Sequence, residues 1–427
     1  MKLLLVVPRK PPRCEIKDWT VATPLGICYI ASVLQNEGHE VKIIDPTPLG
    51  WDLGRLVQES LRYKPDIIGI SSSTPAFGET KNIVSAVKSS DKTITLVVGG
   101  PHISFTAEEE MKRCHEIDYA VIGEGELTIV DLVKRISKGF GFKNVKGIGY
   151  RKNGEIVLTE RRPFIQNLDE IPFPARDLLP IKKYPKYTRI SVVTTRGCPF
   201  YCSFCVTAEM NGHFLRKRSI NSIVDELESI HHDYPTRGIE FEDDCFANDK
   251  LFIKRLCKEI TNRKLCITWN CETRVTDARK ETLNLMKKAG CDNVFFGVES
   301  GSQYTLNKLG KGILLKDSVR AVKNAHEIGI DRVVCGFVIG FPWEDTNKVK
   351  QTIRFAKRLK QHFGAEIAFS FLMPFPGTRI RSVMEDAGLY IEKNYDLYFE
   401  RAPVAPTKYL TKDELGQLFL EFVNILM

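Results

Sequence analysis

The sequence lacks any apolar run that approaches the roughly 20 residues of a membrane-spanning helix. Its longest apolar stretches, such as residues 333–341, have the length of buried strands. The first ten residues, MKLLLVVPRK, contain a short apolar run and no small-residue cleavage site, which predicts a first β-strand instead of a signal peptide. We therefore expect a cytoplasmic protein without a membrane partner.

The chain also lacks low-complexity segments and internal repeats. Its 427 residues are 43% hydrophobic and 27% charged, which excludes a disordered chain and predicts two to three domains of about 150 residues each. The 62 Lys and Arg against 53 Asp and Glu give a net charge of +9. This excess indicates a lysine-rich surface, or attraction to an anionic partner. Because no basic stripe alternates with stacking aromatics, nucleic-acid binding is not expected.

Cysteine, by contrast, is plentiful, with 12 residues. Disulfides are rare in the cytoplasm, so we expect most of these thiols to be small buried hydrophobes. Cys198, Cys202 and Cys205 differ, because they follow a predicted strand with the spacing C-x3-C-x2-C. Thiolates select zinc, Cu(I) or iron–sulfur clusters. A structural zinc site wants four ligands, and no fourth Cys or His lies close by in the sequence, whereas three ligands leave one iron of a four-iron cluster open.

The first 146 residues alternate short apolar runs with helical patterns. Continuous apolar strands separated by helices predict a Rossmann-like, doubly wound parallel sheet, in which ligands sit beyond the carboxyl ends of the strands. The predicted strands are 2–7, 41–45, 67–71, 95–99 and 119–122, and the predicted helices are 26–37, 53–62, 81–89, 107–113 and 127–137. Small and turn residues follow these strands: Pro24, Leu25, Gly26, Ser72, Ser73, Thr74, Gly99, Gly100, Pro101, His102, Gly123, Gly125 and Glu126.

The rest of the chain predicts a second α/β domain. Residues 147–185 are expected to form a linker that contains a hairpin around Asn153-Gly154. Residues 186–390 contain six strand–helix repeats, too few for a full eight-fold barrel, so we expect a partial (β/α)6 barrel. The predicted strands are 190–194, 239–242, 268–271, 293–297, 332–339 and 366–372. Residues 391–427 predict a small helical C-terminal region.

The cysteine spacing, directly after the first strand of a β/α barrel, closely resembles that of the radical S-adenosylmethionine (SAM) superfamily. The resemblance implies a [4Fe–4S] cluster on Cys198, Cys202 and Cys205, with SAM chelating the open iron. It further implies SAM-binding roles for residues at the ends of the later strands and beside the cysteines. These residues are Phe204, Glu242, Asp243, Arg274, Glu299, Ser300 and Gly340.

The first domain and the linker, with its segment Phe173-Pro174-Ala175-Arg176-Asp177, resemble the cobalamin-binding part of class B radical SAM enzymes. The resemblance implies that the loop residues after the five strands hold cobalamin. Cobalamin mutases ligate cobalt with a D-x-H-x-x-G histidine after the first strand, whereas residues 11–19 of this chain contain no histidine. We therefore expect no protein histidine below the cobalt, and we expect Phe77 to face it there.

Within class B the chain looks most like the C-methyltransferases. This implies methylation of an unactivated carbon with two SAM per turnover, through methylcobalamin and a 5′-deoxyadenosyl radical. A cobalamin-dependent cyclase or ring-modifying enzyme acting on a tetrapyrrole or small molecule is the alternative, and a non-catalytic cobalamin or redox sensor is another. The resemblance implies an electron donor such as ferredoxin or flavodoxin. The net charge is compatible with a protein or peptide substrate, for which a residue of methyl-coenzyme M reductase is one candidate.

Overall fold

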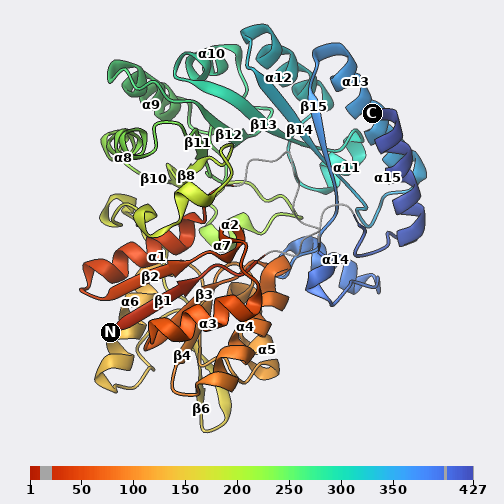
Figure 1. Cartoon of the computed structure of the whole chain (residues 1–427). Helices are drawn as coiled ribbons and strands as arrows, with labels where there is room; N and C mark the ends of the chain where they lie inside the picture. Colours follow the sequence, from red (N-terminus) through yellow and green to blue (C-terminus); the bar gives the residue numbers. More distant parts are fainter. Residues whose placement is uncertain (10–21, 399–401, 427) are drawn as a thin grey trace. The chain divides into compact units, whose positions relative to one another are not determined.

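The computed structural model describes residues 1–9, 22–398 and 402–426, which form two compact units (Figure 1). The first unit ends at Lys186 and the second begins at Tyr187. Ala22 belongs to the second unit, where it forms an isolated parallel bridge with Arg189. Among the described residues, no helix has the length and apolar character needed to cross a membrane.

The first unit contains a seven-stranded sheet in the order β2-β1-β3-β4-β5-β6-β7. The first five strands in the chain pair in parallel, which confirms the Rossmann-like, doubly wound sheet predicted from their apolar runs. They are β1 (Lys2–Val6), β2 (Glu40–Ile44), β3 (Ile67–Ser71), β4 (Thr95–Gly99) and β5 (Tyr119–Val121). The hairpin strands β6 (Ile148–Lys152) and β7 (Glu155–Leu158) join the same sheet, because β6 pairs antiparallel with β5.

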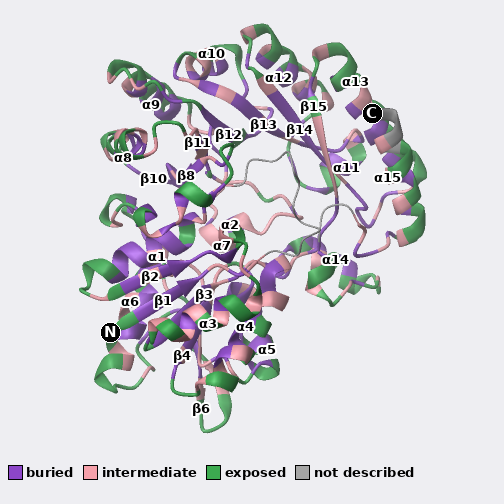
Figure 2. Ribbon diagram, in the orientation of Figure 1, coloured by how far each residue is buried: buried purple, intermediate pink, exposed green. Residues whose placement is uncertain are grey.

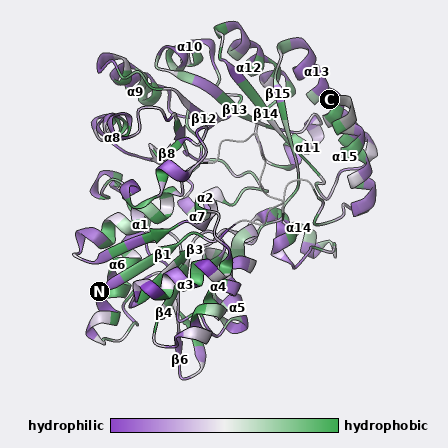
Figure 3. Ribbon diagram, in the orientation of Figure 1, coloured by the Kyte–Doolittle hydropathy of each residue, from purple (hydrophilic) through white to green (hydrophobic). Residues whose placement is uncertain are grey.

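Helices cover this sheet and bury their apolar sides against it (Figures 2 and 3). They are α1 (Leu25–Asn36), α2 (Pro46–Leu49), α3 (Leu53–Tyr63), α4 (Phe77–Ser90), α5 (Ile103–Arg113) and α6 (Glu126–Lys138). The side chain of Asp52 caps α3 by accepting the Arg55 N–H at 2.7 Å, as Asp does at helix starts. Short 3-10 turns follow the hairpin: η3 (Leu168–Glu170), η4 (Arg176–Leu178) and η5 (Ile181–Lys183).

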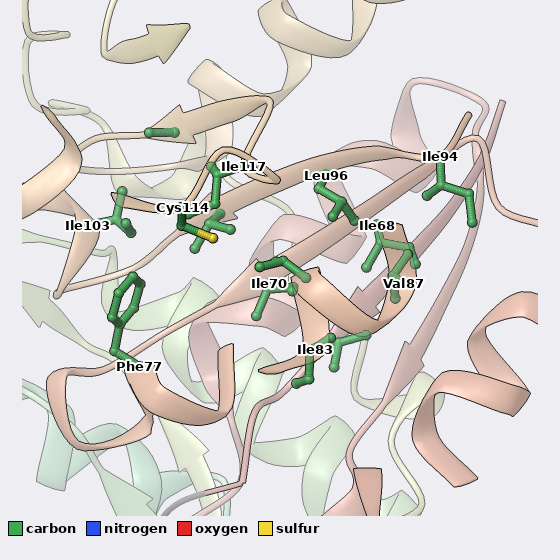
Figure 4. Packing of buried hydrophobic residues seen from close by; sticks show 14 of the residues in the cluster. Ile68, Ile70, Phe77, Ile83, Val87, Ile94, Leu96, Ile103, Cys114 and Ile117 are labelled. Carbon is green, nitrogen blue, oxygen red and sulfur yellow. The ribbon is translucent and has the colours of Figure 1, made fainter. Parts of the chain in front are cut away.

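Isoleucine and valine from the central strands pack against α4 and α5 to form the core of the first unit (Figure 4). Ile68 and Leu96 are fully buried, and each such side chain contributes roughly 1.5–3 kcal/mol by leaving water. Phe77 is also fully buried in this cluster, with its ring 4.2 Å from that of His102. The expectation that Phe77 faces cobalt is therefore wrong: an apolar ring at the start of α4 gains more from the core.

The second unit contains six parallel strands in the order β15-β14-β13-β12-β11-β8, the reverse of their chain order. Strands that are consecutive in the chain are therefore neighbours in the sheet, and helices connect them. This arrangement confirms the predicted partial β/α barrel. The strands are β8 (Ile190–Val192), β11 (Ile239–Phe241), β12 (Trp269–Thr273), β13 (Cys291–Glu299), β14 (Arg332–Ile339) and β15 (Glu366–Phe371). The short strands β9 (Thr195–Arg196) and β10 (Arg216–Lys217) form a separate antiparallel pair.

Side chains alternate across this sheet. Ile239, Phe241 and Trp269 are fully buried under the surrounding helices, whereas Glu242 and Glu272 at the strand ends are accessible to water. The helices are α7 (Thr207–Asn211), α8 (Ile220–Asp233), α9 (Lys250–Asn262), α10 (Lys280–Lys288), α11 (Gln303–Lys308), α12 (Leu315–Ile328), α13 (Thr346–Phe363) and α14 (Arg379–Asp386). The 3-10 turn η6 (Tyr395–Leu397) and α15 (Lys412–Leu426) complete the described chain, and α15 agrees with the predicted helical C-terminus.

Candidate functional site

The three cysteines lie on one loop that begins directly after β9, and this loop is fixed by its backbone. Gly197 has φ +95°, and a Cβ there would lie 2.1 Å from the Phe214 carbonyl oxygen, so only glycine fits. The Cys198 N–H donates to the Gly212 carbonyl at 3.0 Å. The Asp244 carboxylate accepts the Gly197 N–H at 2.8 Å and the Asn211 amide at 3.0 Å. Asp244, which follows β11, therefore braces the start of the cysteine loop.

The charges of two of the cysteines act on the third. Burial raises the pKa of Cys205, and the neighbouring Cys202 and Cys198 add to this effect. A hydrogen bond from the Cys245 thiol lowers the pKa of Cys198 to about 6. No three Cys, His, Asp or Glu side chains of the described chain are placed to hold a single metal ion. A four-iron cluster takes its three thiolates on three different irons, so it fits a wider triad than one ion does.

Two cationic side chains lie beside this loop. The Arg274 guanidinium, at the end of β12, is 3.7 Å from the Cys202 sulfur and 3.6 Å above the Phe200 ring. It also donates to the Lys311 carbonyl, while its Nε lacks a hydrogen-bond partner among the described residues. A buried donor beside thiolates fits an anionic cofactor, because a negatively charged cluster–thiolate group needs nearby positive charge.

Lys311 forms a buried ion pair with Glu299, with the Nζ 2.7 Å from Oε1. Burial opposes the charged form of Lys311, but the charges of Glu299 and Cys202 outweigh it and raise its pKa. Glu299 is a non-glycine residue with φ +67°, at a bulge where β13 and β14 change register. Strain of this kind is held where surrounding contacts fix it, and it is concentrated at functional sites.

Phe204 joins these groups to the end of β14. Its ring lies 5.9 Å from the Lys311 Nζ and 6.1 Å from the Phe341 ring. Gly340, with φ +94°, donates its N–H to the buried Glu344 carboxylate at 3.0 Å. The structure thus links Arg274, Glu299 and Phe204, three residues predicted to bind SAM, through Lys311, and it places Arg274 beside Cys202. Gly340, at the end of β14, is one residue from Phe341, whose ring lies near that of Phe204.

The other three predicted SAM residues bind within the protein. Asp243 is buried and accepts hydrogen bonds from the Thr194 N–H at 2.6 Å and from the Thr195 hydroxyl at 3.1 Å, while burial raises its pKa to about 6. Glu242 is exposed and accepts from the Ser191 hydroxyl at 2.8 Å. Ser300 is fully buried, with its hydroxyl 3.0 Å from that of Thr352 in α13. Their SAM-binding roles stay predictions.

Sequence reasoning missed Lys311 and the bracing role of Asp244. Lys311 stands between Gly310 and Gly312, which both have positive φ, and this Gly-Lys-Gly triplet was the available signal. Asp244 gives no comparable signal, because its partners Gly197 and Asn211 are distant in sequence and become neighbours only in the folded chain.

In the first unit, the predicted cobalamin loops lie at one edge of the sheet. The β3 and β4 loops touch: Ser72 donates its N–H to Gly99 O at 2.9 Å, and His102 donates its N–H to Ser72 O at 3.2 Å. Gly100 has φ +96°, and a Cβ there would lie 2.7 Å from Ser72 O, so this approach requires glycine. The Gly123 N–H, after β5, donates to the Ser104 hydroxyl at 3.0 Å. Small residues thus let the loops after β3, β4 and β5 approach one another closely at this edge, and their roles in cobalamin binding stay predictions.

Other predicted cobalamin residues are internal or begin helices. His102 is buried, with Nδ1 3.2 Å from the Thr74 hydroxyl and Nε2 3.6 Å from Glu110, and burial lowers its pKa. Glu126 is buried in the first turn of α6. Pro24 precedes α1, and Leu25 and Gly26 begin it; Ser73 precedes the 3-10 turn η2 (Thr74–Ala76). The loop at residues 11–19, expected to lack a cobalt ligand, is outside the described residues.

Comparison with known proteins gives the same division of the chain. The B12 binding domain family matches residues 20–133, and the Radical SAM superfamily matches residues 192–356. An uncharacterized methyltransferase of Pyrococcus horikoshii is 36% identical over 421 residues, which is 98% of this chain and 90% of that protein. The chain belongs to the cobalamin-dependent radical SAM family. The cofactors expected from the sequence, cobalamin, SAM and a [4Fe–4S] cluster, are those of this family.

This cobalamin-dependent radical SAM protein is also similar to a curated enzyme and to a solved structure. The anaerobic magnesium-protoporphyrin IX monomethyl ester cyclase of Rubrivivax gelatinosus is 30% identical over 347 residues, 78% of this chain but 62% of that enzyme. The structure of the radical SAM methyltransferase TsrM from Kitasatospora setae, solved with cobalamin and a [4Fe–4S] cluster, matches with a TM-score of 0.79 at 18% identity. It covers 99% of this chain and 88% of that protein. At this identity the match shows the shared fold.

Proposed function

We propose that this protein is a C-methyltransferase that transfers a methyl group to an unactivated carbon. The observation that carries the proposal is the convergence of Arg274, Lys311 and Glu299 beside Cys202, at the strand ends of a barrel that follows a B12 binding domain. The full-length relative from Pyrococcus horikoshii, which is named a methyltransferase, supports it.

In this proposal each residue has a binding or positioning role. Cys198, Cys202 and Cys205 hold the cluster, and Asp244 fixes their loop. Arg274 and the Glu299–Lys311 pair supply the positive and negative groups that the carboxylate, ammonium and ribose of SAM need. The loops after β3, β4 and β5 hold cobalamin. The cofactors supply the methyl transfer and radical chemistry, and the protein supplies orientation and exclusion of water.

The test is an anaerobic assay of the reconstituted protein with cobalamin, SAM and a strong reductant. Formation of both S-adenosylhomocysteine and 5′-deoxyadenosine is expected, because methyl donation yields the first product and radical formation the second. A protein that binds both cofactors and forms neither product is a sensor, and this result contradicts the proposal.

A cobalamin-dependent cyclase or ring-modifying enzyme is the second candidate, favoured by the 30% identity to the Rubrivivax enzyme. Formation of 5′-deoxyadenosine without S-adenosylhomocysteine would select it.

For the methyltransferase we propose a protein or peptide substrate, such as a residue of methyl-coenzyme M reductase, with which the net charge of +9 is compatible. We place the enzyme in the cytoplasm, where thiols stay reduced.

A further inference from the structure

A cavity of about 580 Å³ in the second unit has the cysteine loop as one wall. Tyr201 and Ser203, which flank Cys202, both line it. The Ser203 N–H donates to the Leu309 carbonyl at 2.9 Å, and the Ile380 N–H donates to the Ser203 carbonyl at 2.8 Å. The loop is therefore fixed between the end of α11 and the start of α14, and the cavity lies directly beside a predicted cluster ligand.

The rim of this cavity is cationic. Lys308, Arg379 and Lys408 line it, all three are exposed, and none of them forms an ion pair with another described residue. None of the described residues that line it is Asp or Glu. Three cations gathered on one rim repel one another, so an anionic partner is favoured there.

Two residues of the cavity lining carry a buried polar atom without a partner among the described residues. Ser203 is 8% exposed, and its hydroxyl has no hydrogen-bond partner among the described residues. The Trp343 indole N–H, also in the lining, is buried and equally lacks a described acceptor. Both atoms are themselves shielded from water, so neither meets an occupant of the cavity without a change of its side-chain rotamer.

Exposed aromatic rings line the same cavity. Tyr201 is 66% exposed, Tyr304 is 50% exposed and Tyr409 is 64% exposed. The Tyr201 ring stacks on His213 at 4.2 Å, which holds it in place at the surface. Tyrosine and arginine are enriched at protein–protein interfaces, and electron-transfer complexes use small interfaces of this kind. A protein surface that presents acidic side chains thus fits this rim better than an isolated small anion does.

We propose that this cavity, with Lys308, Arg379 and Lys408 on its rim, is the docking surface for an acidic, low-potential one-electron carrier protein that reduces the cluster. In each encounter the carrier loses one electron and the cluster gains one, with no bond made or broken. Docking here brings the carrier to the Tyr201–Ser203 segment, one peptide bond on either side of Cys202. The inference rests on the family's need for an electron donor and is independent of the methylated substrate.

The test is a charge-reversal triple variant, Lys308→Glu with Arg379→Glu and Lys408→Glu, in the reconstituted holoenzyme. The matched control is Lys254→Glu with Arg255→Glu and Lys258→Glu, which changes three exposed cations on α9 by the same charge. An acidic ferredoxin is the carrier. Its binding is measured by titration at two salt concentrations, and cluster reduction is followed by stopped-flow absorbance, with dithionite as the small-molecule reductant.

We expect the rim variant to weaken ferredoxin binding and slow ferredoxin-driven reduction by about tenfold or more at low salt, with a smaller loss at high salt. Iron content and dithionite-driven reduction should match the wild type, and the α9 variant should behave as wild type throughout. Equal losses in both triple variants, or unchanged reduction by ferredoxin in the rim variant, would overturn the proposal. A third result would also overturn it: the rim variant no longer binds a nucleotide that the wild type binds, yet ferredoxin still reduces its cluster. The occupant of the cavity would then be a small anion.

Discussion

At the scale of single residues, the cysteine triad makes the sharpest prediction. Replacing Cys198, Cys202 or Cys205 by alanine should reduce iron from the four atoms of one [4Fe–4S] cluster to almost none, because each thiolate holds a different iron. The visible absorbance of the cluster should vanish with it. Cys266→Ala is the matched control, since Cys266 is an exposed free thiol of the same unit. Full iron retention in any triad variant would remove that cysteine from the ligand set.

The buried Glu299–Lys311 pair gives a second prediction. Lys311→Met leaves the Glu299 carboxylate buried without its partner at 2.7 Å, which should cost about 3–5 kcal/mol of unfolding free energy. Adding Glu299→Gln removes the orphaned charge, so the double variant should regain part of that stability. Urea unfolding of the apoprotein measures both.

If the double variant is no more stable than Lys311→Met, the cost lies in lost packing and not in unpaired charge. A separate titration with SAM tests the binding role: the double variant should bind SAM more weakly than wild type even where it is folded. This readout distinguishes a positioning pair from one that only stabilises the fold.

Residue-level prediction from sequence places the three cysteines on one loop, and their role as cluster ligands stays a prediction. The C-x3-C-x2-C spacing places three thiolates on one loop whatever the fold, and the structure shows that Cys198 and Cys202 both influence the Cys205 thiol. It failed for Phe77, because a local pattern cannot tell whether an aromatic ring after a strand faces a ligand or joins the core. His102 shows the same difficulty, since it is buried and its ring contacts Thr74 and Glu110, which are distant from it in sequence or a helix turn or more further on.

At the scale of elements, Glu344 ties the end of β14 to α11. Its carboxylate is fully buried and accepts from the Gly340 N–H at 3.0 Å, the Phe341 N–H at 3.2 Å and the Thr305 hydroxyl at 3.2 Å. Burial raises its pKa from 4.5 to about 7. Between these values the folded chain holds a proton that the unfolded chain has lost, so stability should fall as pH rises from about 4.5 to about 7 and then level off.

Glu344→Gln should remove this part of the pH dependence. A shift of this size corresponds to about 3 kcal/mol at most. The loss of unfolding free energy between pH 5 and pH 8 should therefore be smaller in the variant by up to about that amount. Urea unfolding at the two pH values measures it, with Glu281→Gln on the exposed face of α10 as the control. An unchanged pH difference in Glu344→Gln would contradict the assignment.

Prediction of elements from sequence succeeded for the parallel strands. Strands such as β3 and β14 are nearly continuous apolar runs because both of their faces are buried. Helices cover both faces of β3. Helices cover one face of β14, and the barrel interior encloses the other. Which strands pair with each other was harder to predict. The β6–β7 hairpin was expected from Asn153-Gly154, but its attachment to β5 depends on an edge that sequence does not display. The register shift at Glu299 has no local sequence signal at all.

At the scale of the whole molecule, two units carry two family signatures, so loading of the two cofactors should be separable. Gly100→Val should abolish cobalamin binding, because a Cβ there meets the Ser72 backbone at 2.7 Å and the residue has φ +96°. The same variant should keep its iron. Cys202→Ala should show the reverse, with cobalamin bound and iron lost. Corrin absorbance and iron content of the full-length protein report both.

Gly141→Val is the control for Gly100→Val, since a Cβ at Gly141 meets no atom within 4 Å and the residue does not have a positive φ. It should retain both cofactors. Loss of both cofactors in Gly100→Val would mean that damage to the β3–β4 contact spreads into the barrel and that the units depend on each other to fold. If each variant loses only one cofactor, each of them isolates one half-reaction. Methyl transfer to cobalamin needs the cobalamin of the first unit, whereas reductive cleavage of SAM needs only the cluster.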